Sequence, residues 1–295
     1  MKRLAAAALA LVPTLASAFN QPPTNLSLTT FMDGGAPPGL YYVNYTLFLN
    51  GQRAVDKDGK TLSGGAKVSA LSQIHQLYWV TPYKVLGGKL ALDVFQPLVA
   101  VNVAGSLGGT PLTATTGGLG DFGFGPALQW DGGTLFGRPV FQRVESDLIL
   151  PSGHYDKSKS ASPGSNVFTL DSYYSFVWFF ADKWETSLRA WYAFHSENPD
   201  TKVKPGQRLH FNYAVSREVL PKLRLGAAGY FLRQVQDDKV AGTRIADSRE
   251  RVMALGPGLA YLGSGLTVFL SHPVEFLGQN RFVGSRTTLH LVHKF

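Results

Sequence analysis

The sequence predicts an all-β protein: an antiparallel transmembrane β-barrel of about 12 strands, preceded by a cleaved signal peptide. Three observations lead to this prediction. The chain begins with a secretory signal, it continues in repeated segments that partly alternate apolar and polar residues, and the connections between these segments alternate in length.

The signal occupies residues 1–18. Met1-Lys2-Arg3 is a basic start, an apolar run extends from Leu4 to Leu15, and Ala16-Ser17-Ala18 provides small residues at a cleavage site. The apolar run is short for a membrane span, so a retained helical anchor is the weaker alternative. We expect cleavage after Ala18, which makes Phe19 the first residue of the mature chain.

The rest of the chain divides into a short N-terminal segment, 19–39, and a barrel, 40–295. The N-terminal segment lies either in the periplasm or inside the barrel, and the sequence leaves both open. Strands are expected at residues 40–49, 68–80, 88–103, 118–130, 138–149, 168–179, 183–195, 207–217, 222–233, 250–262, 265–275 and 285–295.

Connection length follows strand order. Connections after odd-numbered strands are long and polar, as in Gly51–Lys67, Pro151–Val167 and Gln234–Arg249, whereas those after even-numbered strands are short. Outer-membrane barrels have long external loops and short periplasmic turns, and a soluble β-sandwich, the rival fold, has no reason to alternate in this way. Four tryptophans near the short turns fit an interfacial aromatic belt: Trp79, Trp130, Trp178 and Trp184. We therefore expect localisation in the bacterial outer membrane.

Alternation within strands assigns an apolar face to lipid and a polar face to the lumen. In strand 183–195, Leu188 and Tyr192 share the lipid face, and Glu185 and Arg189 share the other. Strands two, three and ten alternate too poorly to be oriented. The residues expected to line the lumen are Arg143, Glu145, Asp147, Asp171, Glu185, Arg189, Trp191, Arg208, His210 and Asn212.

The last expected strand ends the chain on an aromatic residue, Phe295, with Leu289 and Leu291 on one face. This ending resembles the assembly signal of outer-membrane barrels. We expect Phe295, Leu291 and Leu289 to serve as that signal. The expected partners are outer-membrane lipid, periplasmic chaperones and the barrel-assembly machinery.

Several function classes lack support in the sequence. There is no cysteine, and the seven histidines show no H-E-x-x-H or paired spacing, so we expect no metal site and no cofactor. The net charge of +8 is scattered rather than grouped, which argues against nucleic acid. A hydrolase would need a Ser–His pair, but the neighbours Ser271 and His272 must point to opposite faces of a strand. We expect no catalytic residues and no enzyme activity.

The stretch Gly118–Gly125 is rich in glycine and contains Asp121. No GK[ST] follows it, so a phosphate-binding loop is excluded, and it is best interpreted as a strand that needs small inward residues. Two explanations remain open: the N-terminal segment lies against this strand, or the glycines only serve barrel curvature.

Three motifs carry a family resemblance: Ala36-Pro37-Pro38-Gly39-Leu40-Tyr41-Tyr42, Gly118-Leu119-Gly120-Asp121 and Leu150-Pro151-Ser152-Gly153. From about Ala36 to the C-terminus the chain resembles the protein family associated with the meta-pathway of phenol degradation. The resemblance implies an outer-membrane barrel that admits aromatic or other hydrophobic compounds, and it supplies no catalytic residues.

We therefore expect a passive outer-membrane channel for small hydrophobic or aromatic solutes. Arg189 and Trp191 share the lumen face, and a cation beside an aromatic ring would suit a flat, partly polar molecule. The plain alternative is that Trp191 fills space and Arg189 pairs with Glu185. A structural or adhesive barrel is the rival function, and its best candidate surface is the loop Pro151–Val167, with His154, Tyr155, Asp156, Lys157 and Lys159.

Overall fold

The computed structural model describes residues 21–22, 24–112 and 114–295, so the expected signal peptide and the expected cleavage site at Ala18 lie outside the described residues. The long strands are β1 (Gly39–Val55), β2 (Lys67–Val85), β3 (Gly88–Ala104), β6 (Ala114–Leu119), β7 (Gly123–Leu135), β8 (Arg138–Ile149), β9 (Thr169–Ala181), β10 (Trp184–His195), β12 (Arg208–Leu220), β13 (Leu223–Gln234), β16 (Arg251–Leu262), β17 (Leu266–Ser271), β18 (Val274–Gln279) and β19 (Arg281–Lys294).

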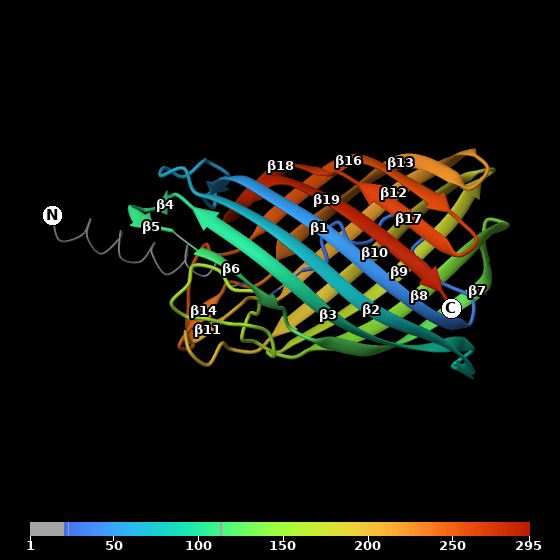
Figure 1. The fold of residues 1–295 in the computed structure, drawn as a ribbon, viewed down its shortest axis with the longest axis horizontal. Helices are drawn as coiled ribbons and strands as arrows, with labels where there is room; N and C mark the ends of the chain where they lie inside the picture. The colour runs from blue at the N-terminus through green and yellow to red at the C-terminus, as the bar shows by residue number, and fades with distance from the viewer. Residues whose placement is uncertain (1–20, 23, 113) are drawn as a thin grey trace.

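These strands form one antiparallel sheet that closes on itself (Figure 1). β6 and β7 follow one another along β3, and β17 and β18 follow one another along β16, so each pair acts as one interrupted barrel strand. The sheet is thus a barrel of twelve strands, and it is closed because β19 pairs with β1 from Tyr41↔Lys294 to Val55↔Arg281. Closure leaves no sheet edge in the bilayer, and the predicted transmembrane barrel is confirmed.

The two ends of the barrel differ as the connections predicted. Long loops gather at one end, where they carry the short strands β4 (Ser106–Leu107), β5 (Thr110–Pro111), β11 (Val203–Lys204), β14 (Lys239–Val240) and β15 (Thr243–Arg244) (Figure 1). Tight turns and the C-terminus lie at the other end. Two of these turns are Leu86-Gly87 and Phe136-Gly137. In each, the first residue has φ 51° and the glycine has φ 76° or 72°. Positive φ at both positions is the backbone of the two-residue hairpin turns that match strand twist.

One predicted connection is wrong. The sequence suggested a long loop after strand 265–275, but β18 continues to Gln279 and only Asn280 separates it from β19. Asn280 adopts φ 51°, which asparagine tolerates, and its side-chain amide donates to the carbonyls of Asp247 and Arg249. Arg281 and Gly284, which were expected in this loop, belong to β19. The Gly284 N–H donates to the Glu275 carboxylate at 2.8 Å, and Arg281 lies 3.4 Å from it.

Burial alternates along most strands, with apolar side chains exposed outward and polar ones buried inward, as in β10 and β12. At the short-turn end the indole N–H of Trp130 donates to the Leu86 carbonyl and that of Trp178 to the Leu135 carbonyl, each at 3.2 Å. Tryptophan with a satisfied N–H at one rim is the arrangement expected at a membrane interface. Among the described residues, no helix has the length and apolar character needed to span a membrane.

Candidate functional site: the barrel lumen

Residues 21–38, described except for residue 23, run along the inside of the barrel, from Gln21 beside the long loops to Pro38 at the start of β1 (Figure 1). Three apolar side chains anchor this N-terminal segment. Leu26 packs with Tyr230 and Leu232, Leu28 belongs to a cluster with β1, β2, β3 and β7, and Phe31 packs among alanines and Phe269. Gly258 makes room for Phe31, because a Cβ there would lie 2.8 Å from the phenyl ring. The segment is therefore packed as part of the fold.

Pairing register arranges the inward side chains of β7 to β12 into three neighbouring transverse rows. The first, here called the basic row, contains Gln129, Arg143, Ser175, Arg189 and Asn212. The N-terminal segment contacts every member of it. Asp33 pairs with both arginines, its carbonyl accepts from the Ser175 hydroxyl at 2.6 Å, Gln129 bonds to the backbone of Ala36, and Asn212 donates to Thr29 at 2.8 Å.

The second row, the aromatic row, contains Glu145, Tyr173, Trp191 and His210. Trp191 and His210 are stacked at 4.5 Å between ring centroids, and the Arg189 guanidinium lies 4.2 Å from the Tyr173 ring and 5.3 Å from the Trp191 ring. The cation–aromatic contact expected from the sequence is thus present. The alternative pairing of Arg189 with Glu185 is wrong, because Arg189 reaches Asp33 and Glu185 accepts hydrogen bonds from Ser187 and Ser216 instead.

The third row, the acidic row, contains Asp93, Gly125, Asp147 and Asp171. Asp93 pairs in register with Gly125, and a Cβ on Gly125 would lie 2.3 Å from Oδ1 of Asp147, so the glycine leaves a notch between two carboxylates. Across Ala193 the same row continues to Arg208, whose guanidinium bonds to Gln21, Pro22 and Thr24 of the N-terminal segment. The acidic row thus differs from the basic row, whose members all bond to that segment.

Three cavities lie one after another along the N-terminal segment. The outer cavity, about 290 Å³, is bordered by residues 161–165 of the long loop between β8 and β9. It shares Leu47 and Ser72 with a middle cavity of about 150 Å³, which in turn shares Tyr45 and Tyr173 with an inner cavity of about 240 Å³ at the short-turn end. β1 and β2 contribute to the lining of all three, and β3 to that of the middle and outer cavities.

All ten residues expected to line the lumen point inward. Nine of them are buried and Asp147 is partly buried. The structure brings eight of them together in the three rows, places Arg208 at the end of the acidic row, and sets Glu185 apart near the short-turn end. That solute passes along them stays a prediction.

Sequence reasoning missed two central residues, Asp33 and Asp93. Asp93 is a single acid in a mainly apolar strand, and such a residue can indicate an inward position. The faces of β3 could not be assigned, however, because its inner face is also apolar. Its neighbours there pack against the N-terminal segment. Asp33 lies in a segment without periodicity, so nothing in the sequence marks its partners.

The glycine-rich stretch does not lie against the N-terminal segment. A Cβ at Gly123 would meet the Phe95 ring at 2.1 Å, and one at Gly125 would meet Asp147. Asp121 interrupts the strand and binds the long loop instead: its carboxylate accepts from the N–H of Gly153 at 2.9 Å and from the N–H of Ser165 at 2.8 Å. Two motifs far apart in the sequence, G-L-G-D and L-P-S-G, therefore meet and hold the loop toward the lumen.

The proposed assembly residues lie at the closing seam. Leu289 and Leu291 are partly buried in β19 opposite β17, and Phe295 is 69% exposed while its N–H donates to the Leu40 carbonyl at 3.0 Å. Their role in assembly stays a prediction. Elsewhere in the wall, Ser271 is buried against Ser27 while His272 points outward to Thr287, so the two form no catalytic pair.

At the long-loop end, the buried Asp238 lies beside Gln21. Burial raises the pKa of Asp238 above its ordinary value, although the Gly206 N–H donates to its carboxylate at 2.8 Å and the Gln234 amide at 2.5 Å. Gln21 also donates to this carboxylate at 3.4 Å, which connects the start of the N-terminal segment to the loop between β13 and β16.

Comparison with family models decides the family. Residues 51–291 match the model described as putative MetA-pathway of phenol degradation, which covers most of the chain. The chain belongs to this family. No curated protein matches the sequence.

Among solved structures, the chain is similar to the COG4313 outer membrane channel from Pseudomonas putida F1, with a TM-score of 0.76 and 17% identity over 89% of this chain and 97% of that one. This likeness establishes the fold. Lower similarity is found to the transport unit of the autotransporter AIDA-I from Escherichia coli (TM-score 0.49, 9% identity, 97% of each chain). The CymD monoaromatic hydrocarbon channel is also similar at that level (TM-score 0.44, 9% identity, 88% of this chain and 89% of that one).

Proposed function

We propose that this protein is a passive channel of the bacterial outer membrane for small hydrophobic or aromatic compounds. The observation that carries the proposal is the series of three cavities, because a passive channel needs a lined path and a downhill gradient. The middle cavity is the smallest, at about 150 Å³, and a cavity of roughly that size accommodates a benzene-sized molecule. It is the point at which solutes would be selected.

The lining of this middle cavity suits such a solute. Leu28, Ile74 and Phe95 provide apolar surface, while Tyr173 and Trp191 present aromatic faces. Arg189 and the carboxylates add polar groups on one side, so a ring with a hydroxyl group could be held weakly. Weak binding is appropriate, since a conducting site must release what it binds. The description of the family, putative MetA-pathway of phenol degradation, agrees with this cargo. The outer membrane channel among the similar solved structures agrees with a channel function.

Uptake measurements test the proposal. A strain lacking the gene, with and without the gene restored, is given labelled aromatic compounds, aliphatic compounds, sugars and amino acids at low external concentration. We expect a deficit confined to the aromatic and hydrophobic compounds. A deficit for all small polar solutes would indicate a general porin, and no deficit with the barrel correctly assembled would favour the structural or adhesive function.

The adhesive alternative has one observation in its favour: Lys157, Ser158 and Lys159 are exposed at the long-loop end. The same loop turns inward, however, and its residues 161–165 border the outer cavity. Because the loop lines the lumen as well as reaching the surface, its position is also explained by a channel, and the channel function is preferred.

A further inference from the structure

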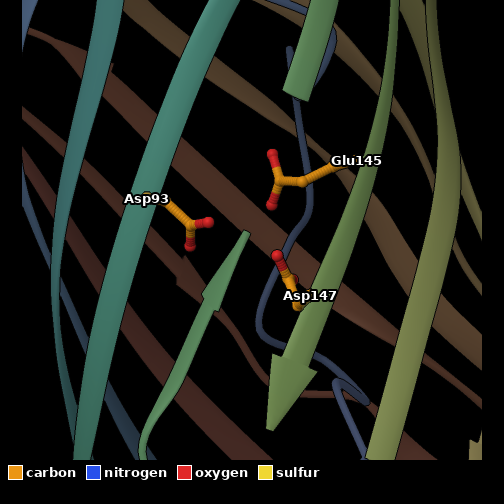
Figure 2. A group of neighbouring side chains, drawn as sticks. All are labelled: Asp93, Glu145 and Asp147. Atoms are coloured by element: carbon orange, nitrogen blue, oxygen red, sulfur yellow. The ribbon is translucent and has the colours of Figure 1, made fainter. Parts of the chain in front are cut away.

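We propose that Asp93, Glu145 and Asp147 form a calcium-binding site in the barrel wall. Their carboxylates come from two strands, β3 and β8, and point toward one another across β7 (Figure 2). One oxygen from each lies within 4.8 Å of the others. Three acidic groups at this distance repel one another, so the lumen must supply positive charge for all three to remain ionised.

The described protein groups do not supply that charge. The guanidiniums of Arg143 and Arg189, in the basic row, pair with Asp33 on the N-terminal segment, and that of Arg208 bonds to the same segment. Asp93 accepts one hydrogen bond, from the Gln76 amide at 2.7 Å. Within the part of the chain that the structure describes, Oδ1 of Asp93, Oε2 of Glu145 and Oδ1 of Asp147 are buried without a hydrogen-bond partner.

A fourth carboxylate gives independent support for a cation. Asp171 is not one of the three, yet it is 7% exposed, sits beside Asp147 in register and borders the same middle cavity. Its Oδ1 also has no hydrogen-bond partner among the described residues. Buried charges in proteins are paired or coordinate metals. Glu145, Asp147 and Asp171 border the middle cavity, and Asp93 lies within reach of the first two. Arg143, Arg189 and Arg208 carry three positive charges, which are too few to balance these four carboxyl groups together with Asp33.

The shape of the site also indicates a cation. Gly125 lies between Asp93 and Asp147, and a side chain there would collide with the Asp147 carboxylate. The glycine therefore keeps open the space that an ion bridging β3 and β8 would need. Calcium is favoured over magnesium because it accepts six to eight oxygen ligands in irregular geometry, whereas magnesium requires a near-ideal octahedron that rigid strands rarely offer.

Bound calcium would neutralise the acidic side of the middle cavity and join β3 to β8 across the glycine strand. The test uses the mature protein refolded in detergent, stripped with EDTA and titrated with TbCl3, whose luminescence is excited through nearby tyrosine and tryptophan. We expect one terbium per chain, displacement by CaCl2 at concentrations at least ten-fold lower than by MgCl2, and a thermal unfolding midpoint that rises with CaCl2.

Two variants and one matched control locate the site. Asp93→Asn and Asp147→Asn, on different strands, should each weaken terbium binding at least ten-fold. Glu185→Gln should not change it, because that buried carboxylate is already satisfied by Ser187 and Ser216. Heat-modifiable gel mobility confirms that each barrel is folded. The proposal is overturned if wild-type protein binds neither ion, which would point to carboxyl groups neutralised by shared protons, or if both variants bind terbium as tightly as wild-type protein.

Discussion

At the scale of single residues, Asp33 organises the lumen. Its side chain is 13% exposed and pairs with Arg143 and Arg189, whose side chains are 10% and 7% exposed. Both guanidiniums also lie over the Tyr173 ring. A buried ion pair gains little over an apolar packing of the same shape, but removal of one partner leaves a buried charge uncompensated. Asp33 is therefore the residue on which the position of the N-terminal segment depends most.

Asp33→Asn should lower the free energy of unfolding by about 3 kcal/mol, since two buried guanidiniums lose their counter-charge. Urea unfolding of the mature protein in lipid vesicles measures this loss. The matched control is Asp58→Asn, where the partner Lys57 is 3.6 Å away and both side chains are more than half exposed; an exposed pair contributes about 0–1 kcal/mol. Equal effects of the two substitutions would show that the Asp33 cluster is not a buried anchor.

Leu188→Arg tests the lipid face of β10. Leu188 points outward and lies away from both ends of its strand, so arginine there should cost about 2–4 kcal/mol in lipid. Val219→Arg also replaces an outward apolar residue, but close to the short turn after β12, where the cost falls to about 0–1 kcal/mol. If unfolding in lipid ranked the two in the opposite order, the assigned depth in the membrane would be wrong.

At the scale of elements, the strands that sequence reasoning located best are those with one polar and one apolar face. β10 and β12 alternate because lipid lies on one side and bonded polar groups on the other. β2 and β3 hide this pattern, because their inner faces carry Tyr78, Val80 and Ala91, which pack in the cluster that contains Leu28. An apolar inner face and an apolar outer face cannot be told apart without knowledge of what occupies the lumen. Prediction of Asp93 as a site residue failed for this reason.

Deletion of Phe295 should reduce assembly several-fold, because the strand that it ends must pair with β1 along its whole length to close the barrel. Deletion of Lys159, an exposed residue of the long loop, removes the same length of chain and should leave assembly unchanged. The two proteins are compared by heat-modifiable gel mobility in isolated outer membranes. Equal assembly would remove Phe295 from the proposed signal.

At the scale of the whole molecule, the N-terminal segment sets the width of the lumen. It bonds to the basic row and leaves three small cavities along its length. The sequence alone predicted the barrel, its two ends and the inward residues of the strands that alternate well, such as β10 and β12. It could not decide between a periplasmic segment and one within the barrel. That choice depends on contacts such as Asp33 with Arg189, which join residues far apart in the sequence.

Removal of residues 21–35, with the signal peptide and the first strand kept, should widen the lumen and expose the basic row. We expect a conductance in planar bilayers several-fold above that of the full mature chain, together with uptake of sugars that the full chain excludes. Unchanged conductance of a folded, truncated barrel would mean that the segment does not limit the pore.

The most direct test of the central claim is uptake of labelled aromatic compounds by cells that carry Ser72→Trp or Leu71→Trp. Ser72 borders both the outer and the middle cavity, so an indole there should block the passage between them. Leu71 is the adjacent residue and points outward, and it is 38% exposed, so the same substitution changes only the lipid face. The account predicts that Ser72→Trp lowers aromatic uptake to the level of the gene deletion while Leu71→Trp retains it. Equal, undiminished uptake by both assembled variants would contradict the claim that solutes pass through these cavities.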